Sequence, residues 1–249
     1  MSYQRLPFGD YYIITSQKYH KVDRPDLPKI EYNHVKYTEK LLGFIPIKVS
    51  AEWECHYDEG RDVIQVNFEA TTGVADWIVN MLFTTKVYDE FMWEGNQIQL
   101  KACKGWMKMW FMMKHQVREA IANLLKEHPD AEVEIVGWSL GSSQAQYCAQ
   151  DLNFNTGIEP HLFTDGSVKP WRKPFSKKKA AILKSYLDSC TKETYNFMHR
   201  SDIVCYMPPF SRYFAMNPVK LGKFKFFGLF KPRTYHTSYG EAQLYEGIK

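Results

Sequence analysis

The chain lacks both a long hydrophobic run and a leader-like N-terminus. None of its apolar stretches approaches the ~20 residues that a membrane-spanning helix needs. Residues 1–7 contain no apolar core of the kind that signal peptides carry. We therefore expect no membrane-spanning helix, and we expect the protein to work in the cytoplasm.

Cysteine is scarce, and its spacing excludes two further classes of protein. The five cysteines are an odd number, and none lies close enough in sequence to another to suggest a disulfide framework or a metal-binding pair. Reduced thiols in a cytosolic protein are the simplest explanation. Accordingly, we expect neither a metal nor any other cofactor.

The size and composition suit one globular domain. A chain of 249 residues with 45% hydrophobic content can build the core of a large α/β domain. We expect a single domain over residues 1–249. Residues 1–44 are rich in tyrosine, proline and charge, and we expect them to form an N-terminal extension of uncertain structure.

The net charge of +4 hides an uneven distribution. Residues 166–233 hold 15 lysines and arginines against 3 acidic residues, a net charge of +12, so the rest of the chain carries −8. A basic segment of this kind suggests an anionic partner, either a membrane surface or a nucleic acid.

Strand-like and helix-like segments alternate along the chain. Those that we expect are strands over 45–57, 63–68, 133–136, 159–163 and 194–198, and helices over 106–126 and 142–152. The helix over 106–126 is the strongest prediction, because its apolar residues recur at helical spacing. This alternation favours an α/β fold whose sheet is parallel at its centre.

The most informative motif is the pentapeptide of residues 137–141, GWSLG, which fits the pattern G-x-S-x-G. It lies between a predicted strand and a predicted helix, as a nucleophile elbow requires. In such an elbow the two glycines avoid steric clashes, and the helix N-terminus faces a developing oxyanion. The alternative is that Ser139 is only a serine in a tight turn.

A nucleophilic serine needs a base and an acid, which follow it in the chain order Ser, Asp/Glu, His in hydrolases with this elbow. After Ser139 the histidines are His161, His199 and His236. Asp202 follows a predicted apolar strand, and His236 is the only histidine after it. The alternatives are that Asp202 only caps a turn and that His236 is a surface residue.

Residues 63–240 resemble the class 3, or fungal-type, lipase family. The similar blocks are Phe68-Glu69-Ala70-Thr71 with Asp76-Trp77 (F-R-G-S/T and the lid helix), Lys104-Gly105-Trp106 (H-x-G-F), residues 137–141 (G-H-S-L-G), residues 202–209 (D-I-V-P-x-L-P-P) and His236-Thr237-Ser238-Tyr239 (H-x-x-Y). Order and spacing agree throughout. The resemblance implies an α/β-hydrolase fold with a central, mostly parallel mixed sheet flanked by helices.

The same resemblance implies roles for single residues. Ser139 would be the nucleophile, His236 the general base and acid, and Asp202 the carboxylate that orients the histidine. The backbone N–H groups of Thr71 and Leu140 would form the oxyanion hole. The implied activity is that of a lipase or esterase that cleaves lipid or other acyl esters through an acyl-enzyme.

Three departures from the family pattern affect loops more than chemistry. Trp138 stands where the family has histidine, Glu69-Ala70 replaces Arg-Gly, and residues 166–169 replace G-S-P-R. Because the catalytic groups themselves are present, two other functions stay open. The site could act as a phospholipase or acyltransferase, or the chain could be a pseudoenzyme that only binds lipid or membrane.

Two apolar segments could contact lipid. The first places Val74, Trp77, Ile78 and Met81 at helical spacing behind the oxyanion loop, which suits either a lid or a core face. The second, over 220–233, mixes basic and aromatic residues and includes Lys223, Phe224, Phe226, Phe227 and Phe230. It suits an anionic lipid interface, with local packing and nucleic-acid binding as alternatives.

Overall fold

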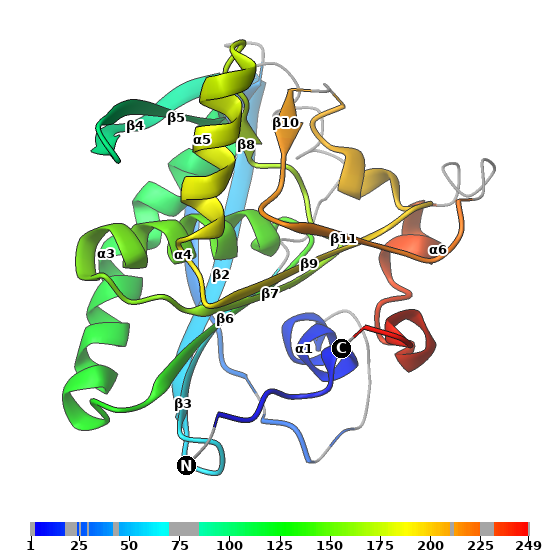
Figure 1. Ribbon diagram of the computed structural model, residues 1–249. Helices are drawn as coiled ribbons and strands as arrows, with labels where there is room; N and C mark the ends of the chain where they lie inside the picture. Colours follow the sequence, from blue (N-terminus) through cyan, green and yellow to red (C-terminus); the bar gives the residue numbers. More distant parts are fainter. Residues whose placement is uncertain are drawn as a thin grey trace.

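The computed structural model describes most of the chain. The described residues are 3–17, 24, 26–28, 30–41, 45–69, 85–209, 212–224 and 232–248. Within these ranges strands and helices alternate through the middle of the chain, as the sequence predicts (Figure 1).

A mixed sheet forms the centre of the fold (Figure 1). In spatial order its described strands are β1 (Asn33–Leu41), β2 (Ile45–Asp58), β3 (Val63–Glu69), β6 (Glu132–Trp138), β7 (His161–Asp165), β9 (Glu193–His199) and β11 (Pro218–Leu221). The pairs β1–β2 and β2–β3 are antiparallel, whereas every pair from β3 to β11 is parallel. This order confirms the mostly parallel mixed sheet and the α/β class.

The predicted strand boundaries agree with the structure to within a few residues. The largest shift is in the strand predicted over 159–163, because β7 begins at His161 and ends at Asp165. Pro160 precedes it and has no N–H to donate to the ladder. The central strands β3, β6 and β7 are buried almost throughout, as parallel strands covered on both faces require.

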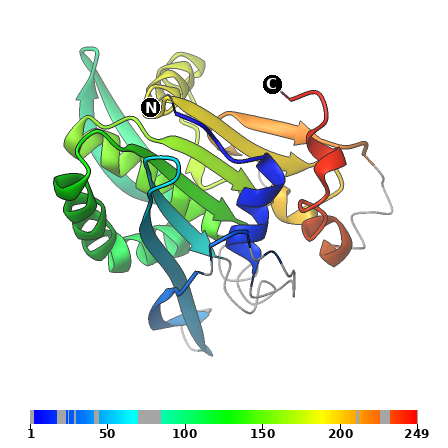
Figure 2. The same ribbon diagram turned by 90° about the horizontal axis from the view of Figure 1, so that it is seen from below.

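Helices cover both faces of the sheet (Figure 2). On one face lie α3 (Lys104–Glu127), α4 (Gly141–Thr156) and α5 (Lys177–Asp188), which share the larger hydrophobic cluster. On the other lie α1 (Phe8–Ser16), the short α6 (Pro232–His236) and the 3-10 helix η3 (Ala242–Tyr245), beside a smaller aromatic cluster. No helix in the described ranges is long and apolar enough to span a bilayer.

The long helix α3 confirms the prediction made from periodicity. Five of its apolar residues at helical spacing are buried, namely Trp106, Trp110, Met113, Val117 and Ile121. The backbone N–H of His128 then caps the helix by donating to the Leu124 carbonyl at 2.8 Å. The periodic stripe therefore faces the core, and the helix ends where the His-Pro pair predicts.

A second, smaller sheet has no counterpart in the sequence predictions. Its strands are β4 (Thr85–Trp93), β5 (Asn96–Cys103), β8 (Trp171–Arg172) and β10 (Tyr213–Phe214), in the order β10-β8-β5-β4. All three pairings are antiparallel. Two of the strands have only two residues, too few to produce a recognisable alternation.

Helix α1 lies within the N-terminal segment whose structure the sequence did not define. It packs against β3, β6 and β7 on the face opposite α3. Tyr11, Tyr12 and Ile14 are each at most 2% exposed, and Thr15 and Ser16 are fully buried. A helix that is buried on nearly every side has no amphipathic stripe, which explains why periodicity did not reveal it.

Candidate active site

Ser139 occupies a sharp turn between β6 and α4. Its φ of +56° lies in the left-handed region, which a non-glycine residue rarely adopts. Its N–H donates to the carbonyl of Asp165, at the end of β7, over 2.8 Å. Its own carbonyl accepts from the N–H of Ser142 over 3.1 Å. The turn is therefore fixed on both sides, and strain of this kind is typical of functional sites.

The two glycines of the pentapeptide are required by close backbone contacts. A Cβ atom at position 137 would lie 2.6 Å from the carbonyl oxygen of Gly141. A Cβ atom at position 141 would lie 2.1 Å from the carbonyl oxygen of Phe68, at the end of β3. The second contact brings the end of β3 against the start of α4, as a nucleophile elbow needs.

Asp202 and His236 form a buried, hydrogen-bonded pair. Asp202 follows β9 and caps the 3-10 helix η1 (Ile203–Tyr206), and His236 is the last residue of α6. The distance between His236 Nδ1 and Asp202 Oδ2 is 2.7 Å. Residues 34 positions apart are thus joined in the chain order that a triad requires.

Further donors surround the Asp202 carboxylate, which is fully buried. It accepts hydrogen bonds from the Val204 N–H at 2.9 Å, the Tyr239 hydroxyl at 3.2 Å and the Cys205 thiol at 3.3 Å. Burial by itself favours the protonated acid, but the electrostatic attraction to His236 and the hydrogen bonds from His236, Cys205 and Val204 outweigh it, so the pKa of Asp202 lies below its usual value. The carboxylate therefore stays ionised.

An ionised carboxylate at Nδ1 fixes the proton of His236 on that nitrogen and leaves Nε2 as an acceptor. Within the described residues neither His236 Nε2 nor Ser139 Oγ has a hydrogen-bond partner, although both are buried. These are the two atoms that a serine–histidine pair brings together. Catalytic hydrogen bonds are often long in structures without substrate.

The imidazole of His236 lies against the residues beside Ser139. A Cβ atom at Gly166, next to the Asp165 carbonyl that binds Ser139, would lie 2.8 Å from His236 Cε1. The indole of Trp138 stacks on the imidazole with 5.3 Å between the ring centres. Ser139, His236 and Asp202 therefore meet at the carboxyl ends of β6, β7 and β9, where α/β sheets place ligands.

Trp138 and Tyr12 form a wall behind the imidazole. Their rings pack edge to face at 5.6 Å, and the Tyr12 hydroxyl donates to the carbonyl of Thr237 over 3.2 Å. Helix α1 thereby holds the segment that directly follows His236. No sequence motif points to Tyr12, because its contact with Trp138 depends on how α1 packs on the sheet.

The oxyanion-hole prediction is only partly within the described residues. Leu140 lies directly before α4, so its N–H is at the positive end of the helix. Thr71 lies outside the described residues. Glu69, which stands where the family has arginine, is 2% exposed at the end of β3.

Most of the predicted lipid contacts also lie outside the described residues. These are Val74, Trp77, Ile78 and Met81 of the possible lid, and Phe226, Phe227 and Phe230 of the possible interface. Lys223 and Phe224 are described, and both are exposed, with Phe224 at 54%.

Asp165 is a buried acid beside the site that the sequence analysis did not single out. Its carboxylate is 1% exposed and accepts a hydrogen bond from the Tyr245 hydroxyl. Burial raises the pKa of Asp165 well above its usual value, and the Tyr245 hydrogen bond only partly opposes this. The side chain therefore keeps its proton to a higher pH than an exposed aspartate does.

Replacing Asp165 by asparagine is expected to stabilise the protein at neutral pH by roughly 2 kcal/mol. Below the unfolded pKa of 3.8, Asp165 is protonated in both the folded and the unfolded protein, so wild type and variant should differ little in stability. As pH rises above 3.8, Asp165 loses its proton in the unfolded wild type but keeps it in the folded protein. The free energy of unfolding of the wild type therefore falls by up to about 1.4 kcal/mol per pH unit. Urea unfolding at several pH values measures this, and a stability difference that does not widen with pH would contradict it.

Comparison with known proteins agrees with this geometry. The family model described as lipase (class 3) matches residues 65–212, more than half of the chain. A similar fold occurs in a deletion variant of the Rhizomucor miehei lipase–propeptide complex, with a TM-score of 0.56 and 18% identity, covering 70% of this chain and 52% of that one. A variant of MDLA from Penicillium cyclopium has a TM-score of 0.57 and 18% identity, covering 70% of this chain and 59% of that one. Lipase II from Rhizopus niveus has a TM-score of 0.53 and 20% identity, covering 69% of this chain and 60% of that one.

The chain spans between about half and three fifths of the length of these three lipases. At such low identity their likeness establishes the α/β-hydrolase fold alone. The family assignment comes instead from the match over residues 65–212, which covers β6, the elbow and Asp202. On that match, the chain belongs to the class 3 lipase family.

Proposed function

We propose that the protein is a serine carboxylic-ester hydrolase that cleaves lipid or other acyl esters. The observation that carries the proposal is the buried pair of His236 and Asp202, joined at 2.7 Å beside a strained serine turn. A lipid-binding pseudoenzyme would have no need of an ionised carboxylate that fixes the histidine tautomer.

In the proposed first step His236 Nε2 takes the proton of the Ser139 hydroxyl while Oγ attacks the ester carbonyl carbon. Asp202 stabilises the imidazolium that forms. The carbonyl oxygen becomes an oxyanion and accepts hydrogen bonds from the N–H of Leu140 and, in this proposal, of Thr71. The positive end of α4 adds to this stabilisation.

The tetrahedral intermediate then collapses. Its bond to the alcohol oxygen breaks, and His236 gives its proton to the departing alcohol, which leaves Ser139 acylated. Water enters, loses a proton to His236 and attacks the acyl carbon. The carboxylic acid departs and the proton returns to Ser139 Oγ, so the enzyme is restored.

Two features support a lipid substrate. Ser139 and His236 are only 1% and 6% exposed, so a substrate needs a cover that opens, and we propose that Val74, Trp77, Ile78 and Met81 form it. The exposed Lys223 and Phe224 suit contact with an anionic lipid surface. The cytoplasmic location stays a prediction.

A fluorophosphonate probe tests the proposal without knowledge of the natural substrate. The probe is expected to attach covalently to one serine, and mass spectrometry of the digest should place it on Ser139. Its attachment requires an activated hydroxyl, which a serine in an ordinary turn lacks. Absence of labelling on the folded protein would instead favour a pseudoenzyme that only binds lipid or membrane.

A panel of p-nitrophenyl esters with increasing acyl length then identifies the preferred chain. Adding phospholipid together with an alcohol acceptor, and analysing the products, separates plain hydrolysis from phospholipase and acyltransferase activity.

A further inference from the structure

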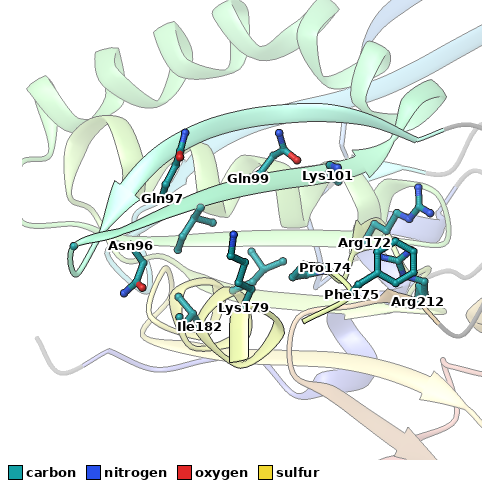
Figure 3. Close-up of a pocket in the computed structure, with 13 residues that line it drawn as sticks. Asn96, Gln97, Gln99, Lys101, Arg172, Pro174, Phe175, Lys179, Ile182 and Arg212 are labelled. Atoms are coloured by element: carbon teal, nitrogen blue, oxygen red, sulfur yellow. The ribbon is translucent and has the colours of Figure 1, made fainter. Parts of the chain in front are cut away.

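A cavity lies away from the proposed triad, between the small sheet and α5 (Figure 3). Its volume is about 640 Å³, within the range of small-molecule sites. Apolar side chains of β5 and α5 line part of it, namely Ile98, Ile182 and Leu183. None of the proposed triad residues lines it.

The charged residues that line the cavity are all basic. They are Lys101 on β5, Arg172 on β8, Lys179 on α5 and Arg212 beside β10, and none of the lining residues is acidic. Figure 3 shows Lys179 reaching from α5 toward β5. Four positive charges around one cavity repel each other, and an anion would relieve that repulsion.

Lys101 and Arg172 lie directly opposite each other across the β5–β8 pair. Like charges in this position destabilise a sheet. One guanidinium nitrogen of Arg172, Nη1, donates to the hydroxyl of Thr85. Its Nε is buried and has no hydrogen-bond partner in the described residues. A donor of this kind is costly to leave unpaired, so the site lacks an acceptor.

The second arginine is held in place at the rim. Arg212 donates to the carbonyl of Lys173 over 2.8 Å, and its guanidinium lies 3.4 Å from the ring centre of Phe175, which is 89% exposed. Figure 3 shows Arg172 and Arg212 at the same end of the cavity, beside Phe175.

The start of α5 adds to the positive potential. The helix begins with three lysines, Lys177, Lys178 and Lys179, and its first turn contains no acidic residue. Helix N-termini ordinarily favour acidic side chains, because the helix dipole is positive there. Lysines in this position therefore increase the demand for an anion.

We infer that this cavity binds a phosphate group carried on a partly apolar ligand. A phosphate monoester carries a charge of about −1.5 to −2 near neutral pH, which matches four cations better than a single carboxylate does. Arginine also binds phosphate oxygens in a bidentate manner. The apolar wall and the exposed Phe175 suit the rest of the ligand, which is either a small phosphate ester or the headgroup of a phospholipid.

Calorimetric titration with glycerol phosphate, together with co-sedimentation with phosphatidylcholine vesicles that contain or lack phosphatidic acid, tests the inference. The test variant carries Lys101→Gln and Lys179→Gln. The matched control carries Lys126→Gln on α3 and Lys184→Gln on α5, which remove the same number of charges at exposed positions that neither line the cavity nor lie at the start of α5. Thermal unfolding should show that both variants are folded.

The test variant is expected to bind the phosphate probes at least about tenfold more weakly than wild type, since each lost charge-assisted hydrogen bond is worth that factor or more. The control should stay within about twofold, as expected for charges outside the contact. Binding of phosphatidic acid vesicles without binding of glycerol phosphate would identify a lipid headgroup. Binding of glycerol phosphate alone would identify a free phosphate ester.

Three results would overturn the inference. The first is that wild type binds neither phosphate probe. The second is that the test and control variants lose affinity equally, which would indicate a diffuse charge effect. The third is that decanoate, an apolar carboxylate, binds at this cavity more tightly than glycerol phosphate.

Discussion

Ser139→Ala is expected to lower kcat for ester hydrolysis by about 10⁶-fold. Alanine removes the attacking oxygen, so no acyl-enzyme forms, and only the slow attack of water within the site is left. The fold should survive, because alanine keeps the Cβ atom in the same backbone conformation. Ser139 Oγ has no partner in the described residues that would be left unpaired.

Rates with p-nitrophenyl esters measure the loss of activity, and thermal unfolding measures whether the variant keeps its stability. Ser139→Gly is a useful control, since glycine accepts the φ of +56° without strain. It should be equally inactive but as stable as the wild type or up to about 1 kcal/mol more stable. An alanine variant that keeps a tenth of the wild-type rate would show that the hydrolysis occurs elsewhere.

Asp202→Asn is expected to lower kcat by about 10⁴-fold. The carboxylate holds the His236 proton on Nδ1, so that Nε2 can accept the proton of the Ser139 hydroxyl. An amide can donate to Nδ1 instead, which shifts the proton to Nε2 and leaves the base blocked. The carboxylate also stabilises the imidazolium, which a neutral amide does not.

The same substitution should reduce the free energy of unfolding by about 1–3 kcal/mol at pH 7. Val204, Cys205, Tyr239 and His236 all donate to the Asp202 carboxylate, and asparagine offers a single acceptor oxygen. The folded pKa lies below the unfolded 3.8, so this stability is present above pH 3.8 and is lost as pH falls through the folded pKa.

Urea unfolding at neutral and acidic pH, with kinetics at neutral pH, measures these effects. The matched control is Asp188→Asn, which removes an exposed carboxylate paired with Lys184. It should change stability by less than about 1 kcal/mol and leave the rate unaltered. A fully active Asp202→Asn variant would remove Asp202 from the proposed mechanism.

Local sequence determined the elements whose signals lie within one segment. The helix over 106–126 follows from a repeating apolar stripe, and the elbow follows from two glycines around Ser139 between an apolar strand and a helix. Asp202 and His236 could be named because chain order leaves few candidates. Their 2.7 Å contact, however, depends on the positions of β9 and α6 in space.

Only the tertiary structure decided which distant residues surround the site. Tyr12 and Asp165 carry no motif, and they matter because α1 and the end of β7 pack beside the elbow. The cavity of Lys101, Arg172 and Arg212 arises from short strands that pair across long stretches of chain. Periodicity and chain order can be read directly along the sequence. Burial and the grouping of charges are set by packing between segments that are far apart in sequence.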